Sequence, residues 1–349
     1  MSLLTYLHAA PKAELHIHLE GAIAPATALD LAQCNGIELP GHDEAGIRAW
    51  FAYHDFDHFL TVIRAVVRCL CTAADYERVV YELGATLARQ HARYAEVTMT
   101  PSLHHLRGVP FETYFAGMTN GRARVLADFG VELAWIFAII RRWDDPTRVV
   151  PMADDTLSVA IEGRENGVVA LGLAAAEADA PPEPFAPWFD RARAAGLHSA
   201  PHAGESAGPP SIWGAIHSLG AERIAHGVRA IEDPALVEYL AEHQLPLDVA
   251  PTSNLRIGVY PSLAAHPLLH LHAAGVPLTI NTDDPPLFGT TLNDEVALLA
   301  DPFGLDVAAC DTILLNAVRY SFLPAERRAA LDASFRAELD RLKSVHLRA

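Results

Sequence analysis

Short apolar runs alternate along the chain with longer stretches in which apolar residues recur at helical spacing. This alternation is typical of βα units and predicts a parallel sheet whose strands are buried on both faces. The eight apolar runs predict strands at residues 13–19, 94–100, 131–140, 168–173, 197–201, 223–226, 245–250 and 276–281. Eight such units predict an α/β fold of the (β/α)8 TIM-barrel type.

Helical spacing predicts helices between these strands, at residues 25–34, 74–91, 111–126, 185–195 and 234–243. The interval 35–93 is long enough for two or three helices, an insertion after the first strand that we expect over the active-site mouth of the barrel. After the last strand, residues 292–349 predict helices only. We expect residues 1–349 to form a single barrel domain, since a chain of this length exceeds the roughly 250 residues of a simple barrel.

The net charge of the chain limits the kinds of partner that we expect. Lys and Arg number 26 against 43 Asp and Glu, a formal net charge of −17, and the arginines are scattered. Such a chain would repel a phosphate backbone or an anionic membrane surface, so we expect a small, uncharged substrate and no nucleic acid or membrane partner.

The N-terminal residues and the cysteines give expectations about where the protein is located. The N-terminal residues lack a basic, apolar leader and no run approaches the ~20 residues of a membrane span, so a cytoplasmic location is expected. The four cysteines show no paired zinc spacing, and we expect them to be reduced core residues. Nothing in the sequence indicates the oligomeric state.

Histidines mark the end of the first predicted strand. Because side chains alternate along a strand, His16 and His18 point to the same side, where one divalent ion can bind both. Taken alone, the pair could equally be two histidines satisfied by local hydrogen bonds. Polar residues also follow other strands, however, and in a barrel these strand ends meet on one face. They are His202 and Glu205 after the fifth strand, His226 at the sixth, and Asp283 with Asp284 after the eighth.

Three imidazoles and one carboxylate would suit zinc. His16, His18, His202 and Asp283 are the predicted ligands of one Zn2+ per chain, with a position left for water, whose pKa the ion lowers toward 7. These ligands, together with His226 and Glu205, make up the predicted catalytic centre.

The remaining polar residues have predicted roles in proton transfer and recognition. His226 is placed to accept a proton from the water, and Glu205 to donate one to a ring nitrogen, while Asp284 could contact a second ring nitrogen. Simpler explanations exist: Glu205 could cap a helix near Ser211, His226 could be a core histidine, and Asp284 could be a turn residue. The other histidines are expected to be structural or at the surface.

The motifs together resemble the adenosine and adenine deaminase family. They are Pro11-Lys-Ala-Glu-Leu-His16-Ile-His18-Leu-Glu20-Gly21, His202-Ala-Gly-Glu205, Ile224-Ala-His226-Gly227 and Asn281-Thr-Asp283-Asp284-Pro285, in the family's order and spacing. The resemblance implies a TIM barrel with one catalytic zinc that hydrolyses C6 of an adenine ring and releases ammonia. It also implies ring contacts from Glu205 to N1 and from Asp284 to N7, assistance from His226, and a backbone contact to N3 at Ala175.

The resemblance leaves the substrate open. Glu20 stands where adenosine deaminases usually carry an aspartate that reaches the ribose, and where adenine deaminases often carry glutamate. Adenosine or a 5'-modified relative such as aminodeoxyfutalosine is the first expectation, free adenine the second, and an N6-substituted purine the third. Phe56, Phe59 and Leu60 are candidate pocket walls, although they could merely pack the insertion onto the barrel.

Two other functions fit the sequence less well. A two-metal amidohydrolase commonly needs a bridging lysine inside the barrel, and the only lysines are Lys12 and Lys343. A non-catalytic zinc-binding protein would have no need of Glu205 and His226, since groups that transfer protons serve only turnover. A zinc-dependent aminohydrolase is therefore the main prediction.

Overall fold

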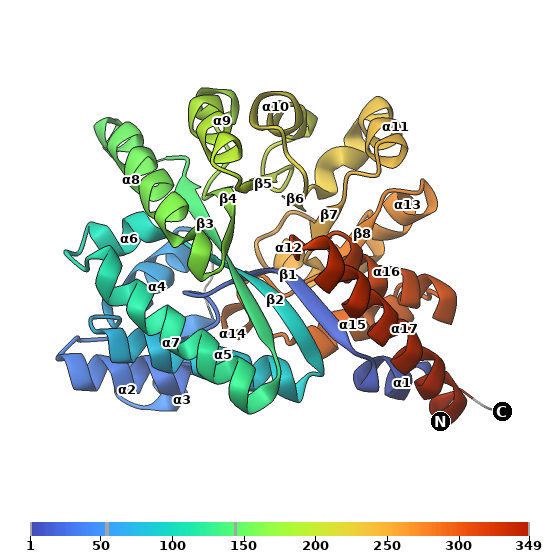
Figure 1. Cartoon of the computed structure of the whole chain (residues 1–349), viewed down its shortest axis with the longest axis horizontal. Helices are drawn as coiled ribbons and strands as arrows, with labels where there is room; N and C mark the ends of the chain where they lie inside the picture. The colour runs from blue at the N-terminus through green and yellow to red at the C-terminus, as the bar shows by residue number, and fades with distance from the viewer. Residues whose placement is uncertain (1, 53–55, 143–144, 348–349) are drawn as a thin grey trace.

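Eight parallel strands form the centre of the molecule and follow one another in chain order (Figure 1). The computed structural model describes residues 2–52, 56–142 and 145–347, without the side chains of residues 56 and 57. The strands are β1 (Lys12–His18), β2 (Ala92–Met99), β3 (Glu132–Ile140), β4 (Val168–Ala174), β5 (His198–Ala203), β6 (Ile224–His226), β7 (Leu247–Val249) and β8 (Leu278–Ile280). Each lies within two residues of its predicted bounds, and the predicted TIM barrel is confirmed.

Backbone contacts join the two edges of this sheet. The amide of Asp283 donates to the carbonyl of His16 at 3.1 Å, and the amide of His18 donates to the carbonyl of Asp283 at 2.9 Å. These two bonds bring the chain after β8 against β1 and so close the ring of strands. Residues that lie far apart in the sequence are thereby held side by side at the carboxyl end of β1.

Helices surround the strands (Figure 1). Those from the N-terminus to β4 are α1 (Leu3–Ala9), α2 (Pro25–Asn35), α3 (Glu44–Phe51), α4 (Phe56–Arg68), α5 (Ala73–Arg89), α6 (Pro101–His105), α7 (Phe111–Phe129) and α8 (Val149–Glu162). Those that follow are α9 (Ala186–Ala194), α10 (Pro209–Leu219), α11 (Pro234–Glu242), α12 (Pro251–Arg256), α13 (Leu268–Ala273), α14 (Pro285–Phe288), α15 (Leu292–Ala300), α16 (Val307–Arg319) and α17 (Ala325–His346). The five helices predicted between strands are all present.

Prolines begin several helices at the carboxyl ends of the strands. Pro101, Pro251 and Pro285 are the first residues of α6, α12 and α14. Proline suits this position, because its fixed φ matches the helix and the amide hydrogen that it lacks would have no partner there. The strands β2, β7 and β8 therefore pass into a helix within a few residues, and the intervening residues are held at the mouth of the barrel.

The two ends of the chain pack together. Helix α17 contacts both α16 and α1, beside the point where the chain begins (Figure 1). The hydroxyl of Tyr6 on α1 donates to Asp311 on α16 at 2.5 Å, and Asp311 also pairs with Lys343 of α17 at 2.6 Å. One carboxylate thus joins three helices.

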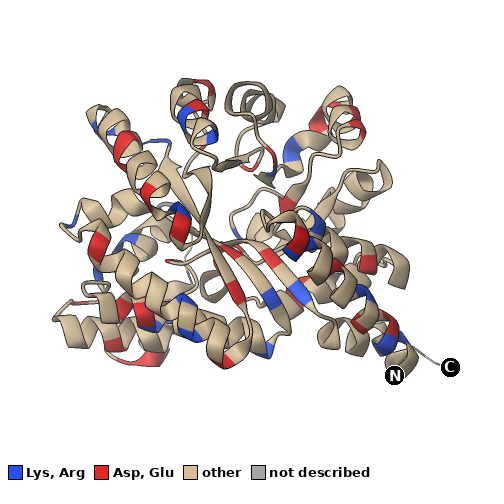
Figure 2. Cartoon of the chain, in the orientation of Figure 1, with Lys and Arg blue, Asp and Glu red and all other residues tan. Residues whose placement is uncertain are grey.

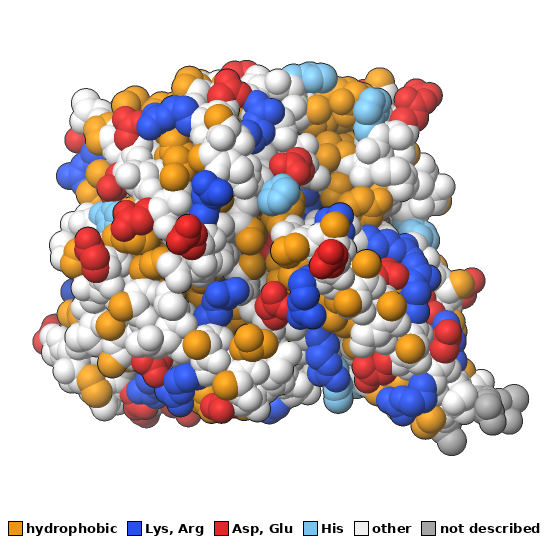
Figure 3. Space-filling view, in the orientation of Figure 1, with side chains coloured by type: hydrophobic (Ala, Val, Ile, Leu, Met, Phe, Trp, Pro, Cys, Tyr) orange, Lys and Arg blue, Asp and Glu red, His pale blue; other side chains and the backbone are white. Residues whose placement is uncertain are grey.

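Charged residues of both signs are interspersed along the chain. Lys and Arg are dispersed over the ribbon among Asp and Glu (Figure 2), and on the face shown in Figure 3 side chains of both signs lie among apolar ones. Within the described residues, no helix is long and apolar enough to span a membrane. The expectation for the cysteines is wrong in part, since Cys69 and Cys310 are buried but Cys34 is exposed on α2.

Candidate active site

Five polar side chains converge at the carboxyl ends of the strands. The Nε2 atom of His202 lies 3.1 Å from that of His16 and 3.2 Å from that of His18. Oδ1 of Asp283 lies 3.4 Å from His16 Nε2 and 3.2 Å from His18 Nε2. The fifth side chain is His226, and one ligand atom each from His16, His202, His226 and Asp283 can be chosen within 4.8 Å of one another.

These separations fit a zinc ion. Zinc bonds of about 2.0–2.2 Å in a tetrahedron place neighbouring ligand atoms roughly 3.3–3.6 Å apart. Four of the six separations among the ligand atoms of His16, His18, His202 and Asp283 are 3.1–3.4 Å. His226 is turned differently, because its Nε2 lies 3.1 Å from Glu205 Oε1 and 3.8 Å from Asp283 Oδ2. The predicted four ligands therefore form one compact set, and His226 lies beside it.

Backbone conformation is unusual at three positions of the site. Ala175, His226 and Asp283 have φ angles of 73°, 64° and 64°, in the left-handed region that non-glycine residues rarely occupy. Each such residue costs on the order of 1–3 kcal/mol, which the surrounding structure must offset. The strain turns the chain sharply at the ends of β4, β6 and β8, and it aims these residues into the mouth.

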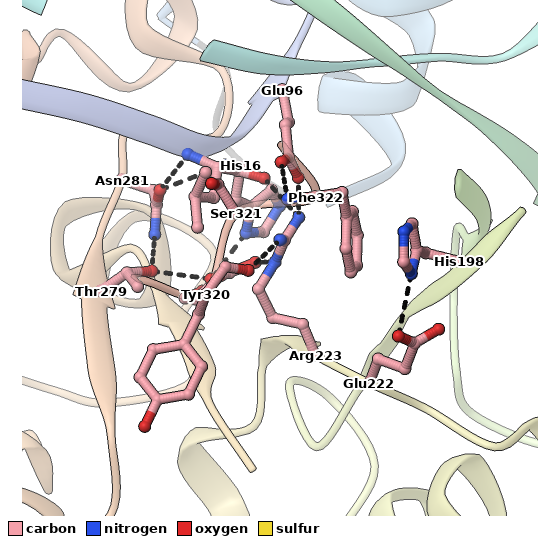
Figure 4. A network of polar contacts seen from close by, with 12 residues as sticks. His16, Glu96, His198, Glu222, Arg223, Thr279, Asn281, Tyr320, Ser321 and Phe322 are labelled. Carbon is pink, nitrogen blue, oxygen red and sulfur yellow. Dashed lines mark hydrogen bonds and ion pairs between the residues drawn. The ribbon is translucent and has the colours of Figure 1, made fainter. Parts of the chain in front are cut away.

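Hydrogen bonds to neighbouring segments of the barrel hold His16 in place (Figure 4). The side-chain oxygen of Asn281 accepts from the amides of Leu15 at 2.8 Å and His16 at 3.1 Å. The Nδ1 atom of His16 lies 3.3 Å from the carbonyl of Asp248. Nδ1 therefore carries the hydrogen, and Nε2 is left bare to bind a metal.

A buried ionic network lies beneath these contacts (Figure 4). Arg223 is fully buried and bonds to both Glu96 and Asp248. Its guanidinium lies 4.3 Å above the ring of Phe322, which stacks in turn on His198. The carboxylates outnumber the cation by one, and the amide of Phe322 supplies a further donor, to Glu96 at 2.6 Å. The centre of the barrel is therefore polar and extensively hydrogen-bonded.

The electrostatics of the cluster suit metal ligation. Burial, reinforced by the neighbouring His16 and His18, holds the pKa of His202 well below its ordinary value. Burial alone would raise the pKa of Asp283, but the surrounding imidazoles, His16 foremost, hold it well below its ordinary value. Neutral imidazole and ionised carboxylate are the forms that bind zinc.

Glu205 and Asp284 have the opposite character. Burial and the negative charge of Asp283 raise the pKa of both carboxyl groups well above its ordinary value. The raised pKa favours the protonated form of each group, which can donate a hydrogen bond. Asp284 packs so closely on the backbone of Gly21 that a Cβ atom there would lie 1.5 Å from its Oδ1, so only glycine leaves room for it.

One buried carboxylate, that of Glu177, holds the loop that carries Glu205. Glu177, buried after β4, accepts from the amides of Glu205, Ser206 and Ala207 at 2.8–3.0 Å through Oε2. Its Oε1 accepts from the amide of Gly204 at 2.8 Å and from the hydroxyl of Ser211 at 2.6 Å. Four successive amides wrapped around one carboxylate form a nest, which fixes the path of the chain on both sides of Glu205.

Arg141, at the end of β3, completes this arrangement. Its guanidinium is buried, donates to the carbonyl of His202, and lies 3.9 Å from Oε1 of Glu177. The loop after β5 is therefore tied to the ends of both β3 and β4.

The two carboxylate oxygens of Glu20 have different surroundings. Oε1 accepts from the amide of Thr100 at 2.8 Å and lies 3.4 Å from Nε2 of His104, which bonds through Nδ1 to Tyr76 at 2.6 Å. Burial alone would raise the pKa of Glu20, but His104 and the amide of Thr100 outweigh it and lower the pKa. Oε2 is buried and has no hydrogen-bond partner among the described residues. An ionised acceptor is thus left for a ligand.

A cavity of about 450 Å3 opens over these groups. Glu20, Glu205 and Asp284 line its floor beside the histidines, and Ala174 to Ala176 form part of one side. Helix α4 forms much of the outer wall. The wall residues are Phe59, Leu60, Ile63 and Arg64 of α4, with Leu103, Ile140, Arg142, Ile257 and Phe288. The side chain of Phe56, the third predicted wall residue, lies outside the described residues.

The motifs do not include every residue that shapes the site. Glu177 follows β4 and Asn254 follows β7. No polar residue after either strand was predicted to belong to the site. The rule that polar residues at strand ends converge in a barrel applies to both positions and could have found them. His104, counted among structural or surface histidines, is buried against Glu20.

A parallel barrel that gathers imidazoles and a carboxylate at its strand ends, with protonated carboxyls beside them, has the features of a metal-dependent hydrolase. The family model for adenosine deaminase matches residues 11–337. The chain belongs to the adenosine deaminase family, and it is a hydrolytic deaminase.

Individual relatives agree with this placement. An aminodeoxyfutalosine deaminase of Streptomyces avermitilis is 39% identical over 332 residues, 94% of this chain and 91% of the relative. An adenine deaminase of Cupriavidus taiwanensis is 36% identical, over 96% of this chain and 93% of the relative. A crystal structure of an amidohydrolase with bound zinc, from Burkholderia ambifaria, superposes with a TM-score of 0.90 at 28% identity, covering 99% of this chain and 95% of that one.

Proposed function

We propose that the protein deaminates the adenine ring of a small nucleoside, adenosine or a 5'-modified relative such as aminodeoxyfutalosine, with release of ammonia. The observation that carries the proposal is the position of two carboxyl groups, Glu205 and Asp284, which line the cavity beside the imidazole cluster. The raised pKa of each group favours the form that donates a hydrogen bond, and N1 and N7 of adenine are acceptors. A purine held between them would have C6 next to the cluster.

His16, His18, His202 and Asp283 are proposed to hold one zinc ion per chain. When bound, zinc acts as a Lewis acid that lowers the pKa of a water molecule to about 7. The hydroxyl of Ser253 donates to Oδ2 of Asp283 at 2.7 Å, which leaves Oδ1 for the ion. The amides of Leu15 and His16, bound by Asn281, keep the β1 histidines in place.

The remaining side chains would handle the protons and the ring. Glu205 gives its proton to N1 as the oxygen of water adds to C6, so that the ring does not accumulate negative charge. Glu205, now ionised, takes one proton from the added water, and the second proton of water passes to the amino nitrogen. The bond from C6 to that nitrogen then breaks, and the products are a 6-oxo purine and ammonia. His226 lies 3.1 Å from Glu205 and would contact the attacking oxygen.

The outer cavity favours a substrate larger than adenine. Besides the predicted ring contacts, the cavity is lined by apolar residues of α4 and by Arg64 and Arg142. A 5' substituent would reach this region, and arginines would suit an anionic one, contrary to the uncharged substrate expected from the net charge. The relative named as an aminodeoxyfutalosine deaminase supports the same choice.

Free adenine is the second candidate, and one observation favours it. Glu20 Oε2 is buried and unpaired among the described residues, and the ring N9–H of the free base is a donor that a nucleoside lacks. In a nucleoside complex the same oxygen would have to accept from a sugar hydroxyl. The adenine deaminase relative fits this alternative.

One panel tests both. We would compare kcat/KM of the zinc-loaded enzyme for adenosine, 5'-deoxy-5'-methylthioadenosine, aminodeoxyfutalosine, adenine and N6-methyladenine, from release of ammonia or methylamine. A preference for a 5'-modified nucleoside supports the proposal, and a preference for adenine supports the alternative. No turnover of any compound, with zinc bound, would contradict both.

A further inference from the structure

His226 is held by a chain of buried hydrogen bonds that the proposed mechanism has not used. Its Nδ1 lies 3.2 Å from the side-chain nitrogen of Asn254, whose oxygen lies 3.1 Å from Nε2 of His266. The chain ends at the backbone, because the amide of Leu268 donates to Nδ1 of His266 at 3.2 Å. Asn254, His266 and His226 are all at most 3% exposed.

The directions of these bonds are fixed from the backbone end. An amide N–H can only donate, so Nδ1 of His266 is an acceptor and its hydrogen must be on Nε2. That hydrogen is donated to the oxygen of Asn254. Asn254 must then present its NH2 group to His226 and donate to Nδ1. In the neutral ring of His226, the hydrogen is consequently on Nε2.

Burial supports the neutral form of His266, because it lowers the pKa of this imidazole to about 4. A doubly protonated His266 would place a donor against the amide of Leu268. The imidazole ring of His266 has little freedom to turn over, since it packs against the rings of Tyr260 and Phe303.

We propose that Asn254 and His266 are positioning residues that hold His226 with its hydrogen on Nε2. His226 then presents a donor to Glu205 and to the attacking oxygen. This differs from the sequence prediction, in which His226 accepts a proton from the water. A donor at this position stabilises the negative charge that the oxygen carries once the water has lost a proton.

The meaning for the reaction rests on the proposed deaminase function, but the tautomer is a property of the resting protein. It can be measured without turnover. Zinc-loaded enzyme with 15N-labelled histidine gives long-range 1H–15N spectra in which bare, protonated and metal-bound ring nitrogens have different shifts. The signals of His226 are identified by their loss in His226→Gln.

The expected spectrum shows protonated Nε2 and bare Nδ1 for His226. Protonated Nδ1, or a metal-bound Nε2, would overturn the proposal whether or not the enzyme deaminates a purine. Failure of the substrate panel, in contrast, would overturn the proposed function and leave this spectrum unchanged. The two failures are therefore distinguishable.

The variant Asn254→Asp tests the cause. Its carboxylate can only accept, so Nδ1 of His226 must become the donor and the tautomer should invert. An inverted tautomer of a catalytic imidazole can cost about 10⁴-fold in kcat, and we expect a loss of at least about 100-fold with KM changed much less. An unchanged tautomer in this variant would show that Asn254 does not set it.

The matched control is Asn316→Asp. Asn316 is also buried and donates through its side chain to a backbone carbonyl, that of Leu278, but it lies on α16. The control should leave the His226 signals as they are in the unsubstituted enzyme. The same inversion in the control would contradict a specific role for Asn254. If Asn254→Asp does not fold, the spectrum of the unsubstituted enzyme still decides the tautomer.

Discussion

Replacing Glu177 by glutamine tests how strongly the fold positions Glu205. The carboxylate accepts five hydrogen bonds of 2.6–3.0 Å, four of them from successive amides. A glutamine oxygen in the place of Oε2 can keep the amides of Glu205, Ser206 and Ala207. Its NH2 group then faces the amide of Gly204, donor against donor, and the charge opposite Arg141 is lost.

The size of the effect follows from these contacts. One buried, unsatisfied amide costs about 1–3 kcal/mol, and the lost charge moves the total toward the upper end of that range. A domain with a stability of about 5–15 kcal/mol remains folded after such a loss. Displacement of a reacting group by about 1 Å can cost about 100-fold, so we expect kcat of Glu177→Gln to fall by about 10- to 100-fold.

The assay combines kinetics with hydrogen exchange. In the unsubstituted enzyme the amides of residues 204–207 should exchange slowly, and in Glu177→Gln they should exchange faster while kcat falls more than KM changes. Glu183→Gln is the control, because this exposed carboxylate lies six residues further along the same segment and accepts none of these amides. A normal kcat in Glu177→Gln, or exchange of these amides at the control rate, would refute the reasoning.

Three further predictions follow from the site. Glu205→Gln should keep zinc and lose most of kcat. In the unsubstituted enzyme, kcat should fall as pH rises through the raised pKa of Glu205, because this group must be protonated to act as an acid. A pH-independent kcat would contradict that role. Asp283→Ala should abolish turnover and lower the zinc content found by metal analysis, and near-normal activity would argue against the ligand set. Burial raises the pKa of Glu295 to about 7, so folding favours its protonated form and stability should fall as pH rises from about 4.5 to 7. Glu295→Gln should therefore be more stable than the unsubstituted protein at pH 8.5, by at most about 3 kcal/mol, and nearly equal at pH 4 in thermal unfolding.

Much of the barrel could be predicted because its strands are short, apolar and regularly spaced. Each observed strand lies within two residues of the prediction, and the boundary errors occur where propensity changes gradually, as at Leu245 before β7. Two-residue alternation also placed His16 and His18 on one side of β1. In both cases the information is local in the sequence.

The missing parts of the site depend on contacts between distant segments. Glu177 resembles any loop glutamate until β4 and β5 bring four amides around it. The tautomer of His226 depends on Leu268, 42 positions further along the sequence, through two intermediate side chains. No periodicity or motif records such a chain of donors, because each link is set by the three-dimensional path of the backbone.

Asp283 shows how closely the fold and the chemistry are joined. Its backbone closes the barrel by bonding to His16 and His18, while its carboxylate lies against the side chains of the same two residues. The left-handed φ of 64° is what allows one residue to do both, since it turns the side chain back toward the strand that its amide contacts. The cost of this conformation is offset by two backbone bonds and the bond from Ser253. The position of the predicted metal ligands is therefore determined by the same bonds that close the ring of strands.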